Sequence, residues 1–363
     1  MSTVVVKIGT SSVTDARGDV DTAAIAKLCG EVASARAEGH RALIVTSGAI
    51  TAGLPALGLH EARPTDLATL QAVAAVGQPR LMRVYDDTLA THGLVGGQVL
   101  LAPLDFVHRQ QYLHAKQTLT RLLELGVVPV INENDAVADD EIRFGDNDRL
   151  AALVAHLVAA DVLLLLTDTA GVFTADPRLD DAASLIEEIV AVDAALEAAA
   201  GGPGSVRGSG GMASKVAAAR IASHSGVRTV IAAAGRPGVV AAAVAGESGI
   251  GTVVQAGDRL LSARKLWIAF AVRAAGRITV DVGARRALVE RGTSLLPAGV
   301  LDADGAFAAG DAVEVLGPDG APFAKGLVAH PAAWVRRWKG QRTDALPPDS
   351  AHEVIHRDDL VVL

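Results

Sequence analysis

The chain has 363 residues, of which 50% are hydrophobic, 20% are charged and 3% are aromatic, and its formal net charge is −8. This length favours two domains, and the composition excludes a disordered chain, a collagen and a disulfide scaffold. From Ser262 onward, 13 basic residues are balanced by 12 acidic ones, so neither part of the chain has the basic excess typical of nucleic-acid binding. The N-terminus shows no signal-peptide pattern, which predicts a cytoplasmic protein.

Strand and helix patterns alternate through the first 255 residues, which predicts an α/β fold. Almost continuously apolar strands are typical of a mainly parallel sheet that is covered by helices on both faces, a three-layer sandwich. The longest apolar stretch, 150–166, carries His156 and Asp161 and is interpreted as a helix and a buried strand rather than a membrane span. The predicted strands are 4–8, 42–46, 94–101, 127–131, 162–167 and 229–233, and the predicted helices include 23–37, 110–125 and 212–225.

The pattern changes between about residues 255 and 275, where short strands and turns replace long helices. We therefore predict a first domain at 1–255, a linker at 256–275 and a small, mostly β second domain at 276–363. In this second domain we expect strand-like segments at 277–282 and 312–316, a helix at 284–291, and turns at 302–305 and 318–320.

Four predicted strand ends carry small or polar residues, at 7–11, 46–49, 132–135 and 167–168. In a parallel sheet such ends can form one site. Gly9 and Gly48 would let backbone N–H groups approach an anion, although ordinary strand-to-helix turns are the alternative. The single cysteine, Cys29, lies in the apolar helix pattern and is interpreted as a packing residue.

Two lysines suggest phosphate binding. Lys7 lies in an apolar strand, where a buried ammonium group needs an anionic partner, unless the side chain extends to solvent. Lys215 follows a glycine-rich segment, 208–211, at a predicted helix start, which suits phosphate capture; a flexible linker is the alternative. This segment has neither the Walker A spacing nor the strand and acidic residue that a dinucleotide-binding motif requires.

The segment Gly145-Asp146-Asn147-Asp148 precedes a predicted helix and could orient an ammonium group, a lysine or a metal-bound phosphate; a helix cap is the alternative. With the segments above, it resembles the amino-acid kinase family. The matching motifs are VVKIGTS at 5–11, VTSGAI at 45–50, VINENDAV at 130–137, GDND at 145–148, LTD at 166–168 and GGMASK at 210–215.

The tail resembles a PUA domain, through residues 278–284 and 288–297, so the resemblance covers nearly the whole chain. A PUA domain is typical of the family members that phosphorylate glutamate. The resemblance therefore implies the amino-acid kinase fold and transfer of the γ-phosphoryl group from ATP to the side-chain carboxylate of L-glutamate. The product would be L-glutamyl 5-phosphate, in the first step of proline biosynthesis.

The resemblance also implies roles for individual residues. Lys7 and Lys215 would neutralise the transferred phosphoryl group, and Asp148 would hold both lysines in place. The glutamate-binding positions would be Ser47, Asp135 and Asn147, and the phosphate path would be lined by Thr10 and Gly48. The ATP-binding positions would be Lys7, Thr167, Asp168, Ser209, Gly210, Gly211, Met212, Ala213, Ser214 and Lys215.

Small departures from the family pattern occur at Ser209, Ala213 and Ser214, and they affect details of nucleotide contact rather than the backbone role of this loop. The expected cofactors are ATP and Mg²⁺, with the metal ion bound mainly by phosphates and water. Proline as a feedback inhibitor and a homo-oligomer, either dimer or tetramer, are further implications.

The sequence leaves two alternatives open. A relative in the same family could phosphorylate N-acetylglutamate, aspartate or UMP, although the tail and the motif at 132–135 favour glutamate. A protein of another class could keep the fold and bind RNA without turnover. The basic-aromatic cluster of Arg336, Arg337, Trp338, Lys339 and Arg342 could contact RNA, but the balanced charge of the tail favours a structural or assembly role.

Overall fold

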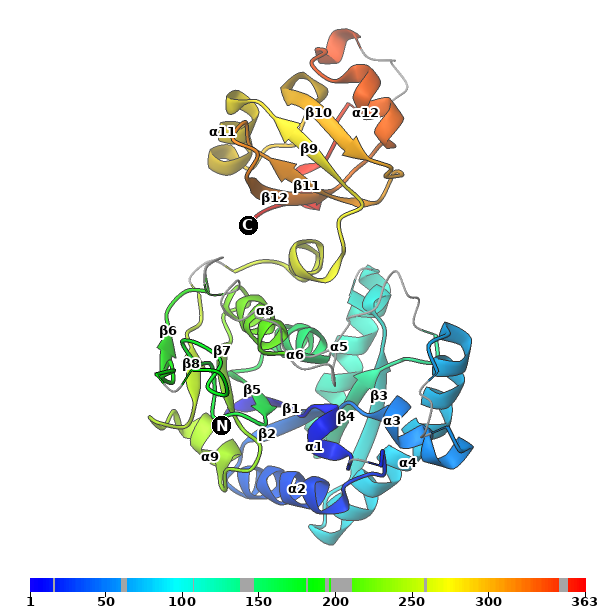
Figure 1. Ribbon diagram of the computed structural model, residues 1–363, viewed down its shortest axis with the longest axis vertical. Coiled ribbons are helices and arrows are strands. Elements are labelled where there is room, and N and C mark those ends of the chain that lie inside the picture. Colours follow the sequence, from blue (N-terminus) through cyan, green and yellow to red (C-terminus); the bar gives the residue numbers. More distant parts are fainter. Residues whose placement is uncertain are drawn as a thin grey trace. The chain divides into compact units, whose positions relative to one another are not determined.

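A computed structural model describes the chain except for residues 16, 60–63, 107, 138–146, 181, 193–195, 197–210, 258–259 and 346–351. It forms two compact units, Met1–Leu261 and Ser262–Leu363 (Figure 1). Each unit has its own apolar core, and each is described by itself.

The first unit is built on an eight-stranded sheet with the order β3-β4-β2-β1-β5-β7-β8-β6. Neighbouring strands are parallel except β7 and β8, which are antiparallel. The predicted mainly parallel sheet is therefore confirmed. Its strands are β1 (Thr3–Lys7), β2 (Arg41–Val45), β3 (Gly96–Leu101), β4 (Val128–Glu133), β5 (Val162–Thr167), β6 (Glu188–Ile189), β7 (Arg228–Ala233) and β8 (Thr252–Val254).

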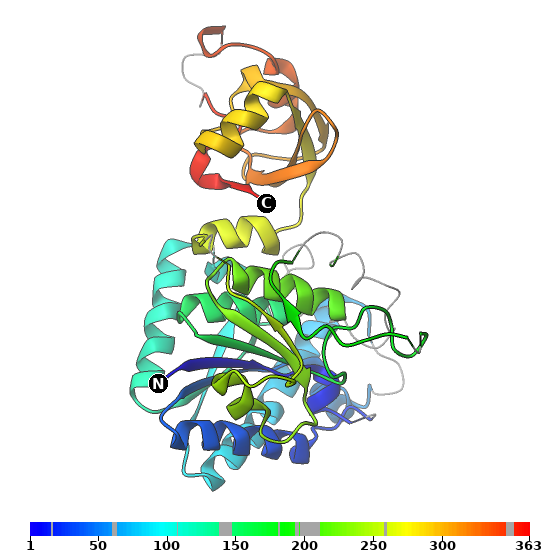
Figure 2. The same ribbon diagram turned by 90° about the vertical axis from the view of Figure 1, so that its left-hand side faces the viewer.

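Helices cover both faces of this sheet, as Figures 1 and 2 show. On one face lie α1 (Thr10–Val13), α2 (Thr22–Ala37), α3 (Ala49–Gly53), α4 (Leu67–Thr91) and α9 (Val239–Ala245). On the other face lie α5 (Arg109–Glu124), α6 (Asn147–Leu157) and α8 (Met212–Ser223). The short helices η1 (Pro55–Leu57) and η2 (Pro103–Phe106) complete the described helical elements of this unit.

Local sequence accounts for the main elements. All of β4 and β5 is buried, as expected for strands with helices on both faces. The helix α2 begins at a capping residue, Asp21, whose carboxylate accepts hydrogen bonds from two backbone N–H groups of the first turn. Cys29 is fully buried in this helix, and burial raises the pKa of its thiol to about 12, which confirms the packing interpretation.

Within the described residues, no helix is long and apolar enough to cross a membrane. The apolar stretch at 150–166 forms most of α6 and then β5, as expected.

The second unit is built on a five-stranded sheet with the order β10-β9-β11-β12-β13, in which only the β9–β11 pair is parallel. Its strands are β9 (Gly276–Val280), β10 (Val300–Gly305), β11 (Ala312–Leu316), β12 (Pro322–Leu327) and β13 (Leu360–Val362). Its helices are α10 (Ala263–Leu266), η3 (Trp267–Ala271, a π-helix), α11 (Val282–Arg291), η4 (Pro297–Gly299), α12 (Ala332–Trp338), η5 (Thr343–Ala345) and η6 (Arg357–Asp359). The small, mostly β domain is thus confirmed.

The turn predicted at 302–305 is wrong, because these residues belong to β10 and pair with β9. Asp302 and Asp304 are exposed, whereas Ala303 between them is buried, as in a strand with one face against the core. Pairing with β9 therefore outweighs the turn-like local composition. Gly305, with φ of +98°, ends the strand. The turn expected at 318–320 is present.

The segment expected as a linker, 256–275, spans the division between the two units and contains α10 and η3. Both elements belong to the second unit and contact the rest of it: Arg264 forms an ion pair with Asp359 at 2.5 Å, and the buried ammonium group of Lys325 donates to the carbonyl oxygen of Ala269 at 3.4 Å.

Candidate active site

A carboxylate lies between two lysine side chains at the carboxyl end of the central strands. The Nζ atom of Lys7 lies 2.6 Å from Oδ1 of Asp148, and the Nζ atom of Lys215 lies 3.1 Å from Oδ2. Lys7 is the last residue of β1, Asp148 lies in the first turn of α6, and Lys215 lies in the first turn of α8. The fold therefore brings together three charged groups that are far apart in the sequence.

All three side chains are buried: Lys7 is 3% exposed, Asp148 0% and Lys215 5%. The alternative in which Lys7 extends to solvent is therefore wrong. Ser214 adds a hydrogen bond to the carboxylate, since its Oγ lies 2.8 Å from Oδ2 of Asp148. Asp148 thus does more than cap a helix, because its carboxylate binds groups from two other elements.

Opposing effects determine the charge of Asp148. Burial would raise the pKa of its carboxyl group, but the positive charges of Lys7 and Lys215, with hydrogen bonds from Lys7 and Ser214, outweigh burial and hold the pKa below its usual value. Two ammonium groups share this one carboxylate, so the described cluster carries a net positive charge. Such a cluster attracts an anion such as phosphate.

Beside the charged cluster, amide side chains form a buried chain of hydrogen bonds. The Nδ2 atom of Asn147 donates to the carbonyl oxygen of Thr46 at 2.5 Å and to Oδ1 of Asn132 at 2.6 Å. Asn132 in turn donates from Nδ2 to Oε1 of Gln78 on α4, at 2.7 Å. The hydroxyl of Thr46 lies 2.9 Å from that of the buried Tyr85. Asn147 is therefore anchored at the start of α6, next to Asp148.

Gly48 makes the turn between β2 and α3, and it requires glycine. Its φ is +102°, and a Cβ atom there would lie 3.2 Å from a methyl carbon of Val13. Ser47 precedes it in the same turn, and Thr10 begins α1 across from it, with a methyl carbon 3.7 Å from that Cβ position. The predicted phosphate-path residues Thr10 and Gly48 are thus neighbours.

The predicted nucleotide residues lie on two elements. Thr167 is the buried last residue of β5, and its hydroxyl donates to Oδ1 of Asp168 at 3.1 Å. Gly211 is the N-cap of α8, and the first turn of this helix contains Met212, Ala213, Ser214 and Lys215. Ser209 and Gly210 lie outside the described residues, as do Gly145 and Asp146. Asp135 is half-buried in the turn after β4.

Sequence reasoning missed Gln78 and Tyr85, which support the site from α4. A signal was present, because a glutamine stands among apolar and small residues in this helix, and it is only 7% exposed. Its partners could not be inferred, since Asn132 is 54 residues away in the sequence.

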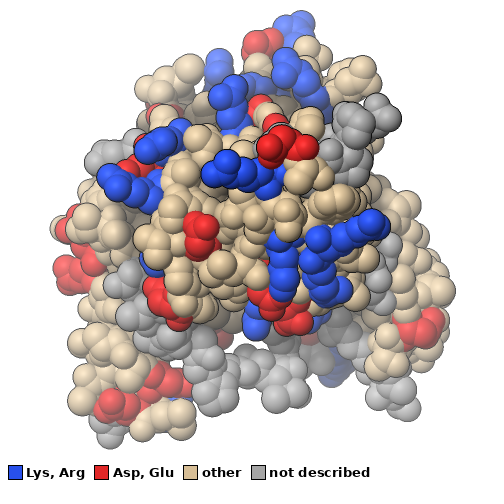
Figure 3. All heavy atoms as spheres, turned by 90° about the horizontal axis from the view of Figure 1, so that it is seen from above, with Lys and Arg blue, Asp and Glu red and all other residues tan. Residues whose placement is uncertain are grey.

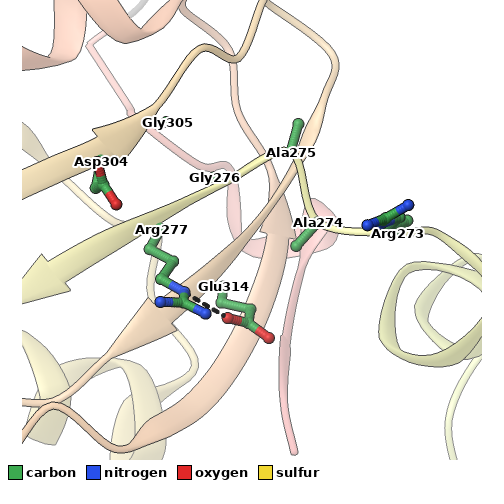
Figure 4. A pocket seen from close by; sticks show the side chains of 8 residues that line it. All are labelled: Arg273, Ala274, Ala275, Gly276, Arg277, Asp304, Gly305 and Glu314. Carbon is green, nitrogen blue, oxygen red and sulfur yellow. Dashed lines mark hydrogen bonds and ion pairs between the residues drawn. The ribbon is translucent and has the colours of Figure 1, made fainter.

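Hollows elsewhere in the molecule do not involve these residues. One, of about 340 Å³, lies along α5 at Gln117, Thr118, Arg121 and Leu122. Another, of about 360 Å³, lies in the second unit, where Arg277 from β9 forms an ion pair with Glu314 from β11 at 3.2 Å (Figure 4). Both groups of that pair are largely open to solvent, so this hollow lacks the buried charge of the first unit's site.

Comparison with known proteins agrees with this architecture. The amino acid kinase family model matches residues 2–233, and the PUA domain model matches residues 276–346. The chain therefore belongs to the amino acid kinase family. A solved structure of isopentenyl phosphate kinase from T. acidophilum, in complex with product, has the same fold, with a TM-score of 0.51 at 19% identity, covering 70% of this chain and all of that one.

Within the family, the chain belongs with the glutamate 5-kinases. It is 45% identical to the glutamate 5-kinase of Pelobacter propionicus over 364 aligned positions, which cover 99% of this chain and 97% of the relative. It has the same identity and coverage with the glutamate 5-kinase of Burkholderia multivorans. The family expectation drawn from the motifs is confirmed.

Proposed function

We propose that the chain transfers the γ-phosphoryl group of ATP to the side-chain carboxylate of L-glutamate, which gives ADP and L-glutamyl 5-phosphate, the first step of proline biosynthesis. The observation that carries this proposal is the buried cluster of Lys7, Asp148 and Lys215 in a chain that matches glutamate 5-kinases over nearly its full length. Its net positive charge suits a reaction in which a phosphoryl group moves between two anions.

The substrate carboxylate is itself the nucleophile, so the reaction needs no general base. A carboxylate oxygen attacks the γ-phosphorus, and the bond from this phosphorus to the bridging oxygen of ADP breaks. Lys7 and Lys215 neutralise negative charge on the transferred group, while Asp148 holds both ammonium groups in place before substrate arrives. The protein therefore contributes position and electrostatics.

The nucleotide is taken as its Mg²⁺ complex. Among the described residues, no group of three or more His, Cys, Asp or Glu side chains could hold a metal ion. As membership in the family implies, phosphate oxygens and water would supply most of the ligands of a magnesium ion that arrives with ATP. Thr167, Asp168 and the start of α8, from Gly211 to Lys215, would contact the nucleotide; the same role for Ser209 and Gly210 rests on the family motif.

Ser47, Asp135 and Asn147 would bind glutamate. Asn147 is fixed beside Asp148, so a substrate bound to it lies next to the two lysines. Thr10 and Gly48 would line the path of the phosphoryl group, where the glycine leaves room that a Cβ atom would occupy.

The PUA domain would have a structural or assembly role. Two members of its basic-aromatic cluster are engaged in its own fold: Arg336 donates to the carbonyl oxygen of Ala303 at 2.9 Å, and Lys339 forms an ion pair with Asp302 at 2.6 Å. Basic and acidic side chains lie next to each other on the face shown in Figure 3. Binding of RNA is the alternative, and it would be strongly salt-dependent.

We further propose that the protein is inhibited by proline, forms a dimer or tetramer and lies in the cytoplasm. We also propose a kinase domain at 1–255, a linker at 256–275 and a PUA domain at 276–363. These parts rest on membership in the family and on the sequence pattern.

Trapping the acyl phosphate with hydroxylamine tests the proposed reaction. The protein is incubated with ATP, Mg²⁺ and one acceptor at a time: L-glutamate, aspartate, N-acetylglutamate or none. A parallel reaction with UMP as the acceptor is followed through the release of ADP. We expect hydroxamate with glutamate alone. Product with another acceptor would assign that acceptor as the substrate. Folded protein that forms no product with any acceptor would favour the RNA-binding alternative.

A further inference from the structure

Three amide side chains form a continuous hydrogen-bonded chain that ends at the glutamate-binding position. Gln78 comes from α4, Asn132 from β4 and Asn147 from α6, and all three are buried. Neither Gln78 nor Asn132 has a role in the phosphoryl transfer proposed for this site. We call these three residues the amide relay.

The backbone fixes the orientation of the middle amide. The N–H group of Glu133 donates to Oδ1 of Asn132 at 2.9 Å, and a backbone N–H group can only donate. The oxygen of Asn132 therefore faces this N–H group and Asn147, and its nitrogen faces Gln78. Gln78 must then present its oxygen, Oε1, because only an acceptor can satisfy that nitrogen.

A second backbone group fixes the orientation of the last amide. The carbonyl oxygen of Thr46 can only accept, so the side-chain nitrogen of Asn147 must face it. The two N–H bonds of this nitrogen go to Thr46 and Asn132, which leaves Oδ1 as the atom of Asn147 that can bind a ligand. No group among the described residues donates to this oxygen in the structure. Asn147 is therefore an acceptor toward the substrate.

Only one part of glutamate can satisfy such an acceptor at neutral pH. Both carboxylates of the substrate have lost their protons, whereas its α-ammonium group carries three N–H donors. We propose that Gln78 is a positioning residue that acts through Asn132 to hold Asn147 as the acceptor of a hydrogen bond from the α-ammonium group of the amino-acid substrate. This inference rests on the function proposed above.

An apolar side chain at position 78 would leave the nitrogen of Asn132 buried without an acceptor, so other orientations of the relay would compete with the one observed. The test compares wild type with Gln78→Met, using L-glutamate and glutarate, which has the same two carboxylates but no amine. We expect Gln78→Met to raise KM for glutamate about tenfold while kcat stays within about threefold, because a hydrogen bond to a charged group is weakened.

The ratio of kcat/KM for glutamate to kcat/KM for glutarate should fall by a similar factor in Gln78→Met. Gln78→Glu, which keeps an oxygen acceptor, should restore KM for glutamate to within about threefold of wild type. Leu81→Val serves as the matched control, since Leu81 is fully buried in the apolar core on the same helix; it should lower thermal stability without changing the ratio.

A folded Gln78→Met variant with an unchanged KM for glutamate, or with equal decreases in kcat/KM for glutamate and glutarate, would overturn the proposed role of the amide relay. If Gln78→Met does not fold, Gln78→Glu decides: a KM for glutamate within about threefold of that of wild type supports the relay, and a larger rise overturns it. Wild-type protein that forms no hydroxamate from glutamate would instead overturn the proposed function, so the two failures are distinguishable.

Discussion

The buried charge cluster of the first unit and two ion pairs of the second unit lie in different surroundings. In the first unit, Lys7, Asp148 and Lys215 are at most 5% exposed and share one cluster. In the second unit, the ion pairs of Arg277 with Glu314 and of Arg285 with Asp319 remain open to water. Charges are costly to bury and contribute little at the surface. The contrast therefore indicates that charge serves chemistry in the buried cluster, whereas these two surface ion pairs serve mainly solvation.

The largest effect expected from this contrast is the loss of a lysine in the cluster. Lys7→Met and Lys215→Met each remove one positive charge near the transferred phosphoryl group, and we expect kcat to fall by about 10³-fold. Hydroxamate formation from glutamate measures the rate, and circular dichroism checks the fold. A folded variant with near wild-type kcat would remove that lysine from the mechanism.

Asp148→Asn should have the next largest effect, on stability as well as on rate. Without the carboxylate, two buried ammonium groups lie close together, so we expect a loss of about 3 kcal/mol in the free energy of unfolding at pH 7.5. Urea denaturation measures this loss. A variant as stable as wild type would show that Asp148 does not compensate the two lysines.

The same variant tests how the free energy of unfolding depends on pH. Because the folded-state pKa of Asp148 lies below its usual value, its ionised form stabilises the protein above the unfolded pKa of about 4, and this stabilisation is lost as pH falls through the folded pKa. Relative to Asp148→Asn, the wild type should therefore lose its advantage in acid. An advantage that grows as pH falls would contradict this assignment.

How much of the site could be predicted depended on whether its residues lie within short motifs. Lys7, Asp148 and Lys215 could be singled out because each stands in a local pattern. Gln78 could not be connected to Asn132, since their contact depends on how α4 packs against the sheet. The mainly parallel sheet followed from apolar runs such as β5, whereas the strand β10 was missed because its turn-like composition is outweighed by pairing with β9.

Gly48→Ala should have a moderate effect in the first unit. A left-handed backbone with φ of +102° and a close contact to Val13 oppose a Cβ atom, so we expect a loss of about 1–2 kcal/mol in stability and a lower kcat/KM. Thermal unfolding and steady-state kinetics measure both. Full activity would show that this turn tolerates a side chain and does not define the phosphate path.

The smallest effect is expected in the second unit. Arg277→Ala removes one partner of an exposed ion pair, so we expect a change of at most about 0.5 kcal/mol in stability and an unchanged kcat. The same assays apply. A large loss of activity would show that the charged surface of this unit contributes to turnover, and the contrast between the units would fail.

A single-turnover measurement on Lys215→Met shows whether the buried cluster acts on the chemical step, because it separates phosphoryl transfer from substrate binding and product release. Enzyme in excess over ATP is mixed with glutamate and quenched at successive times. If the buried cluster stabilises the transition state, the rate of the transfer step falls by about the same 10³-fold as kcat, while the Kd for ATP rises by no more than about tenfold. A wild-type rate of transfer with weakened ATP binding alone would show that the cluster only holds the nucleotide, and would contradict its role in stabilising the transition state.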